Sequence, residues 1–146
     1  MKLAARHKVF LAAAAACLAL GFINYLLFSP QILFFSFLHI HPAHHFIIHN
    51  VLLRHIVTGY ASDTLWVCAL CLVTLVFTEL KQLRFTERII ILMLPVLLEF
   101  AQYFRLVAGT FDIADIAVYL TIITAFIYFF PGLISLQNYN DEKQYN

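Results

Sequence analysis

The sequence predicts an all-α membrane protein, a bundle of four transmembrane helices with a short interfacial or re-entrant helix in the first outer loop. Composition is the first reason: 63% of the 146 residues are hydrophobic and 12% are charged, whereas soluble domains are about 45–50% apolar and about 25% charged. The second reason is that four windows each hold roughly 17–25 mostly apolar residues, the length that a spanning helix needs. With nine Lys and Arg and a net charge of +1, the chain has neither the charged surface of a soluble enzyme nor the basic patch of a nucleic-acid-binding protein.

The predicted spans follow one another along a single transmembrane domain that covers residues 1–146. They are, in order, residues 9–28, 64–80, 89–107 and 113–136. The first span begins like a signal peptide, with Lys2, Arg6 and Lys8 before an apolar run. That run is longer than the apolar core of a signal peptide, which has about 7–15 residues, so we expect a retained anchor. A polar tail at residues 137–146 follows the last span.

Lys and Arg residues beside the spans predict the orientation, because short cytoplasmic loops carry an excess of positive charge. In a four-span arrangement seven of them fall on one side: Lys2, Arg6, Lys8, Lys81, Arg84, Arg88 and Lys143. Arg54 and Arg105 fall on the other side. We therefore expect both termini in the cytoplasm and residues 29–62 outside.

The outer segment 29–62 is rich in histidine. Its histidines are His39, His41, His44, His45, His49 and His55. Residues 42–57 have the length of a short helix, too short and too polar to span, so we expect this helix to lie along or re-enter the outer interface. His41 with His45, and His45 with His49, have the i, i+4 spacing that lets two imidazoles reach one metal ion. No Cys or carboxylate lies within the cluster to complete a site, so we expect no metal and no cofactor.

Glu99 is the most informative residue of the sequence. It lies ten residues into the third predicted span, ~15 Å deep at ~1.5 Å per residue. A carboxylate at that depth is costly unless it is protonated or paired, so it indicates a functional site. Gln102 and Tyr103 follow at i+3 and i+4 and share its helical face. The alternative is a protonated Glu99 that bonds Gln102 or a neighbouring helix for packing alone.

More acidic residues lie at the outer ends of the neighbouring spans. Asp112, Asp115 and Tyr119 are spaced i, i+3, i+7, which places them on one helical face. An alternative explains the two acids by the helix start, with Thr110 or Asp112 as N-cap and Asp115 as a first-turn acid. Asp63, at the outer start of the second span, has the same alternative.

Capping explains each acid alone, but it does not explain why all of them fall in the outer half with Glu99. Their clustering favours a polar outer pocket. Arg54 and Arg105 are the outer cations and hence the natural partners of acids that cannot all stay ionised together.

Two short polar segments stand out in the last two predicted spans. One runs from Glu99 to Gln102, and the other from Asp112 to Asp115 with Tyr119 four residues on. They resemble the E-x-x-Q and D-x-x-D segments of the VanZ-like family, small bacterial membrane proteins named for a teicoplanin-resistance component.

The resemblance extends to the region before the second span. There Arg54, a Gly-Tyr pair and Asp63 are similar to the second motif of the family. Thr110 and Tyr119 stand where many members have Arg and Asn, so the chain looks like a divergent member. The resemblance implies a bundle of four or five helices with polar residues near the outer face, and it fixes no molecular activity.

We therefore expect a multi-pass protein of the bacterial inner membrane whose outer-leaflet pocket recognises an amphiphilic envelope ligand or partner. Its role would lie in antibiotic resistance or the cell envelope, and we do not expect an enzyme. The predicted ligand-binding residues are Glu99, Gln102, Asp112, Asp115, Tyr119, Asp63 and Arg54. Two alternatives are an accessory or assembly subunit of a larger membrane complex, and a small proton- or ion-coupled carrier in which Glu99 titrates.

Overall fold

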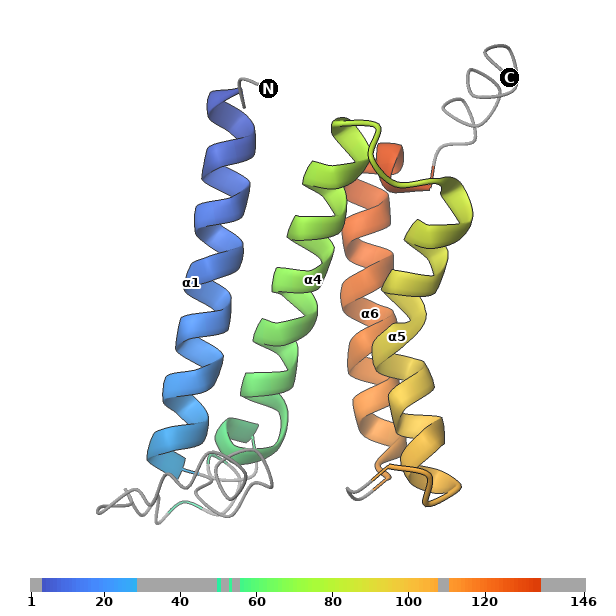
Figure 1. The fold of residues 1–146 in the computed structure, drawn as a ribbon. Helices are drawn as coiled ribbons and strands as arrows, with labels where there is room; N and C mark the ends of the chain where they lie inside the picture. Colours follow the sequence, from blue (N-terminus) through green and yellow to red (C-terminus); the bar gives the residue numbers. More distant parts are fainter. Residues whose placement is uncertain (1–3, 29–49, 51–52, 54–55, 108–110, 135–146) are drawn as a thin grey trace.

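The described residues form helices joined by short turns, with no strand among them. A computed structural model of the chain describes residues 4–28, 50, 53, 56–107 and 111–134. Four long helices run alternately up and down (Figure 1): α1 (Ala5–Phe28), α4 (Ser62–Glu79), α5 (Phe85–Tyr103) and α6 (Ile113–Phe129). A π-helical turn, η1 (Ile56–Ala61), leads into α4, and a 3-10 turn, η2 (Pro131–Leu133), follows α6. The predicted all-α class with four main helices is confirmed for these residues.

Several predictions fall on residues outside the described ranges. These are most of the interfacial helix at residues 42–57, of which only 50, 53, 56 and 57 are described, together with Arg54, the six histidines of segment 29–62 and the polar tail at residues 137–146. They stay predictions from the sequence.

Two helices of the described part are long and apolar enough to cross a membrane. They are α1 and the segment Gly59–Glu79, which contains α4. The third helix, α5, has 19 residues that include Glu87, Arg88 and Glu99. The fourth, α6, is apolar but has only 17 residues.

The third and fourth helices end earlier than the sequence predicts. After Tyr103, the backbone N–H of Arg105 donates to Gln102 O at 2.9 Å and that of Leu106 donates to Ala101 O at 2.8 Å, with Arg105 at φ 58°. This is a Schellman motif, which closes a helix with one left-handed residue.

The end of α6 is set by proline. Phe130 leaves the helical region, at φ −130° and ψ 71°, immediately before Pro131. The residue before a proline is disfavoured in the α region because it clashes with the proline ring. The apolar run to Leu136 therefore does not form one continuous helix.

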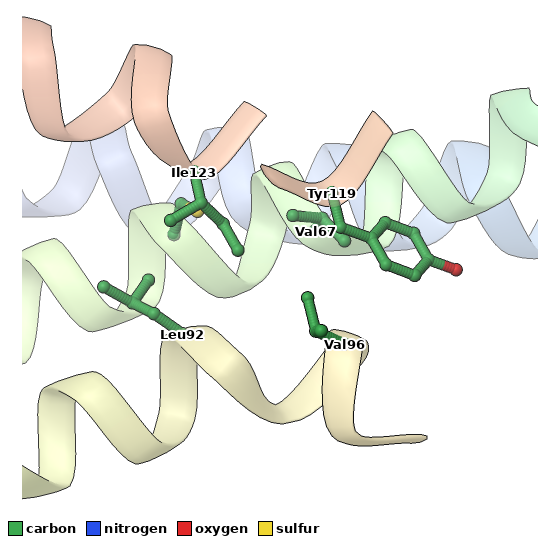
Figure 2. Close-up of a cluster of buried hydrophobic side chains, with 6 residues drawn as sticks. Val67, Leu92, Val96, Tyr119 and Ile123 are labelled. Atoms are coloured by element: carbon green, nitrogen blue, oxygen red, sulfur yellow. The ribbon is translucent and has the colours of Figure 1, made fainter. Parts of the chain in front are cut away.

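Helix α4 is the centre of the bundle. It packs against α1 on one side and against α5 and α6 on the other, and α5 also packs against α6. The apolar core lies between α4, α5 and α6 (Figure 2). Its buried members are Val67, Cys71, Leu92, Val96, Tyr119 and Ile123. Because α1 contacts mainly α4, most of its surface stays outside this core.

The contact between α1 and α4 depends on a glycine. A Cβ atom at Gly21 would lie 3.0 Å from Nε1 of Trp66, tighter than ordinary van der Waals contact, so a side chain here would have to push the Trp66 ring aside. Beside it, Asn24 Nδ2 donates to Ser62 Oγ at 2.6 Å and to Val57 O at 2.7 Å. These contacts fix the rotation and height of α1 relative to α4.

Helix α5 carries two ionisable residues on its buried face, and its exposed face is apolar. Arg88 is 2% exposed and Glu99 is 5% exposed, in line with Leu92 and Val96. The exposed apolar residues of the same helix are Ile89, Ile90, Leu94, Leu97, Leu98 and Phe100. This is the reverse of the pattern of a helix on the surface of a soluble protein.

The alternating directions of the helices give the bundle two chemically different ends. We call the end at which α1 and α5 finish and α4 and α6 begin the polar end, since it holds Asp63, Glu99 and Asp112. We call the opposite end the basic end. Its cations are Arg6, Lys8, Lys81, Arg84 and Arg88.

Candidate functional site

Asp63 is the residue at which three helices meet at the polar end. It lies in the first turn of α4, and its Oδ1 accepts a hydrogen bond of 2.6 Å from the hydroxyl of Tyr25, in the last turn of α1. The hydroxyl of Tyr119, on α6, interacts with the same carboxyl group. Figure 2 shows the Tyr119 ring beside Val67, with its hydroxyl directed away from Leu92 and the rest of the apolar core.

Helix capping does not account for Asp63. The residue before α4, Ala61, is itself helical at φ −64° and ψ −44°, and it makes no side-chain cap. The π-helical turn η1 thus runs directly into α4, so this position has no open helix N-terminus. The carboxyl group serves the contact between helices instead.

Glu99 faces the interior of the bundle, as predicted from its depth in the span. Its side chain is 5% exposed, and its Oε2 accepts a hydrogen bond of 3.3 Å from the backbone N–H of Asp112 at the start of α6. It lies within electrostatic range of Asp63 and Asp112. The described hydrogen bond of Glu99 thus joins two helices and does not involve Gln102, which is half-buried on the same helix.

Tyr103 does not share the site with Glu99. It is 60% exposed, and its ring packs edge-on against Phe111, with 5.1 Å between the ring centroids. The hydrogen bond from Asp112 shows that α6 begins level with Glu99. Tyr103 lies four residues further, ~6 Å beyond that level at ~1.5 Å per residue, where α6 has no residue to cover it.

Asp112 is the N-cap of α6, one of the two alternatives that the sequence leaves open. Its Oδ1 accepts a hydrogen bond of 2.8 Å from the backbone N–H of Ala114. Asp115 lies in the first turn of the same helix, within electrostatic range of Tyr25 and Tyr119. Capping therefore explains the position of Asp112, while Asp115 stays close to the hydroxyl groups around Asp63.

The structure brings most of the predicted site residues together and adds one that the sequence analysis missed. We define the polar cluster as Tyr25, Asp63, Glu99, Asp112, Asp115 and Tyr119. The missed member is Tyr25, which the sequence shows only as part of the apolar run of the first span. An aromatic residue with a polar tip near the end of a span is the one signal that could have drawn attention to it.

The polar cluster offers hydrogen-bond acceptors and hydroxyl donors at one end of an otherwise apolar bundle. At the opposite, basic end, Glu79 pairs with Arg6 at 2.8 Å and contacts His7 Nε2 at 3.0 Å. Carboxylates and tyrosine hydroxyls suit the ammonium or hydroxyl groups of a polar headgroup. In the described part of the chain, no three His, Cys, Asp or Glu side chains are grouped so that they could hold a metal ion.

No family model, curated protein or solved structure matches this chain. The resemblance to the VanZ-like family therefore depends on the short polar segments around Asp63, Glu99 and Asp112 alone.

Proposed function

We propose that the chain is a multi-pass membrane protein in which all four long helices span the bilayer. The inverted pattern of α5 carries this proposal, since its buried Arg88 and Glu99 face the bundle while its outer face is apolar. Ionisable residues within membrane spans nearly always face the protein interior, because lipid cannot solvate them. The 17 to 19 residues of α4, α5 and α6 give lengths of ~26–29 Å, close to the ~30 Å hydrocarbon core.

The two ends of the bundle support one orientation. The positive-inside rule places the basic end, with Lys81 and Arg84 in the turn between α4 and α5, in the cytoplasm. The polar cluster then lies at the outer face of a bacterial inner membrane. We propose this localisation together with the VanZ-like resemblance.

We propose further that the polar cluster recognises an amphiphilic envelope ligand. The observation that carries this proposal is the meeting of Tyr25, Asp63 and Tyr119 from three different helices beside the buried Glu99. Buried polar groups of this kind are retained in spans when they have a role, because apolar residues would pack at a lower cost. The ligand would place its polar headgroup at the cluster and its apolar part along the outer, apolar faces of the helices.

The packing favours binding over transport. Between the polar cluster and the basic end lies the apolar core, with Leu92 and Ile123 buried at its centre (Figure 2). A proton- or ion-coupled carrier needs polar groups that continue across the membrane. Among the described residues of α5, the inner face between Arg88 and Glu99 is instead occupied by Leu92 and Val96.

The experiment measures protection against teicoplanin, used as the amphiphilic probe, in a sensitive host that expresses the chain. Glu99→Gln and Asp63→Asn keep the side-chain shapes and remove the charges, so we expect both to reduce protection to the level of cells without the protein. The matched control is Glu87→Gln, which removes an exposed carboxylate from the same helix. This variant should fold normally, because Gln still accepts the capping hydrogen bond that Glu87 Oε2 accepts from Arg84 N at 2.8 Å. All variants are compared at equal amounts in the membrane fraction.

Three results would contradict the proposal. Recovery of the wild-type chain in the soluble fraction would reject membrane insertion. Full protection by both Glu99→Gln and Asp63→Asn would reject the polar cluster as the ligand site. Isolation of the chain only as part of a larger complex, with no protection by the chain alone, would favour the accessory-subunit alternative.

A further inference from the structure

A cavity of about 290 Å³ lies at the basic end, opposite the polar cluster. It is formed where the start of α1, the end of α4 and the turn after α6 meet. Its lining residues include Arg6, Thr78, Glu79, Lys81, Phe129 and Phe130. The volume is close to the lower limit of small-molecule sites, about 300 Å³, so a headgroup or a small anion fits.

The charges at this cavity favour an anion. Arg6 and Lys81 both line it, and the one acid of its lining, Glu79, is already paired. Glu79 Oε1 lies 2.8 Å from an amino nitrogen of Arg6, and its Oε2 lies 3.0 Å from His7 Nε2. A guanidinium group has five N–H donors. Arg6, 58% exposed, can therefore bind a second anion without giving up Glu79.

Thr78 supplies a second, independent observation. It is 2% exposed, and its hydroxyl oxygen is buried with no hydrogen-bond partner among the residues described. Threonines in helices commonly bond the carbonyl one turn earlier, as Thr74 does with Leu70 O at 2.7 Å. A buried hydroxyl without a partner is unfavourable. Because Thr78 lines the cavity, a rotation of its side chain would let this hydroxyl donate to an acceptor oxygen bound there.

The remaining walls of the cavity are apolar. Leu75 comes from α4, and Phe129, Phe130 and Pro131 come from the end of α6 and the turn that follows. Phe129 is 72% exposed, so the cavity borders the apolar outer surface of the bundle. A ligand here would have an anionic group beside an apolar segment.

We propose that this cavity binds the phosphate group of an anionic phospholipid of the cytoplasmic leaflet. The inference rests on the proposed membrane placement but not on the ligand proposed for the polar cluster. Arg6 and Lys81 attract the phosphate, the Thr78 hydroxyl donates to one of its oxygens, and the glycerol and upper acyl chains lie against Leu75 and Phe129. Basic pockets between helices on the cytoplasmic side are where such headgroups bind in membrane proteins.

The test is a titration of the purified full chain in detergent with phosphatidylglycerol, followed by native mass spectrometry. We expect one tightly bound lipid per chain and weaker binding of phosphatidylcholine, whose ammonium group meets two cations. Thr78→Val keeps the shape and removes the hydroxyl, and should weaken phosphatidylglycerol binding about tenfold. Arg6→Gln should weaken it about fivefold.

The matched control is Lys8→Gln, a cation on the same helix that does not line the cavity. We expect it to change lipid affinity less than twofold. Thr78→Val should melt at the wild-type temperature or higher, since it removes a hydroxyl that has no partner, so weaker lipid binding by this variant cannot be attributed to unfolding.

Several results would overturn the assignment. Equal affinity for the two lipids, or wild-type binding by Thr78→Val, would reject the site. Equal binding of water-soluble glycerol 3-phosphate would replace the lipid by a free phosphate compound. If the chain bound the two lipids equally but still protected against teicoplanin, the lipid site would be rejected and the polar cluster would not. Recovery of the chain in the soluble fraction would reject the membrane placement on which both proposals rest.

Discussion

The hydrogen bond between Tyr25 and Asp63 gives the sharpest test of how α1 is held to the bundle. At 2.6 Å, it joins the last turn of α1 to the first turn of α4, and its acceptor is a carboxyl group. A hydrogen bond to a charged group contributes about 1.5–3 kcal/mol. Because the Tyr119 hydroxyl also interacts with Asp63 and partly compensates for its loss, we expect a coupling energy of about 1–2 kcal/mol.

The measurement is a double-mutant cycle of Tyr25→Phe and Asp63→Ala, with unfolding followed in mixed micelles. Trp66 is the single tryptophan of the chain, and it lies where α1 meets α4, against Gly21. Its fluorescence therefore reports the docking of α1 directly. The control is Tyr128→Phe, which removes a hydroxyl from a side chain that is 80% exposed and should be additive with Asp63→Ala.

Two results would refute this reasoning. A coupling energy below about 0.5 kcal/mol would mean that the two groups act independently. A Tyr128→Phe variant as destabilised as Tyr25→Phe would mean that the loss reflects any tyrosine hydroxyl and not this contact.

Three further predictions concern the packing, the helix ends and the topology. Gly21→Val should destabilise the bundle by about 1–3 kcal/mol through overpacking. The control Gly132→Ala should change stability little, because a Cβ there meets no atom within 4 Å, and equal effects of the two variants in thermal unfolding would contradict the close approach of α1 to α4. Arg105→Gly should stabilise the folded chain by about 0.5–1 kcal/mol, since Arg105 has φ 58° and glycine adopts this conformation without strain. An equal gain in stability for Arg105→Ala in the same assay would disprove this backbone explanation. Reporters active only in the cytoplasm should give signal when fused near Gln82 and after Gln137, and loss of signal at either position would remove the four-span topology.

The sequence alone determines the helical class and the inward side of α5. A long apolar stretch with few helix-breaking residues favours a helix whatever its neighbours are, and in a bilayer it must do so, because its backbone groups would then have to bond within the segment. The cost of placing Glu99 in lipid also follows from the sequence, which is why its burial could be predicted. The helix start at Asp112 is similarly local, since an N-cap bonds a backbone N–H two residues away, here that of Ala114.

Only the tertiary structure decides which side chains from different helices meet. The period of 3.6 residues fixes directions within one helix, but the rotation and height of one helix relative to another depend on packing. The close approach of Gly21 to Trp66 sets the height at which Tyr25 reaches Asp63. The level at which α6 begins leaves Tyr103 exposed, although its position around the helix is nearly that of Glu99. The cavity beside Thr78 arises in the same way, from the meeting of three helix ends that lie far apart in the sequence.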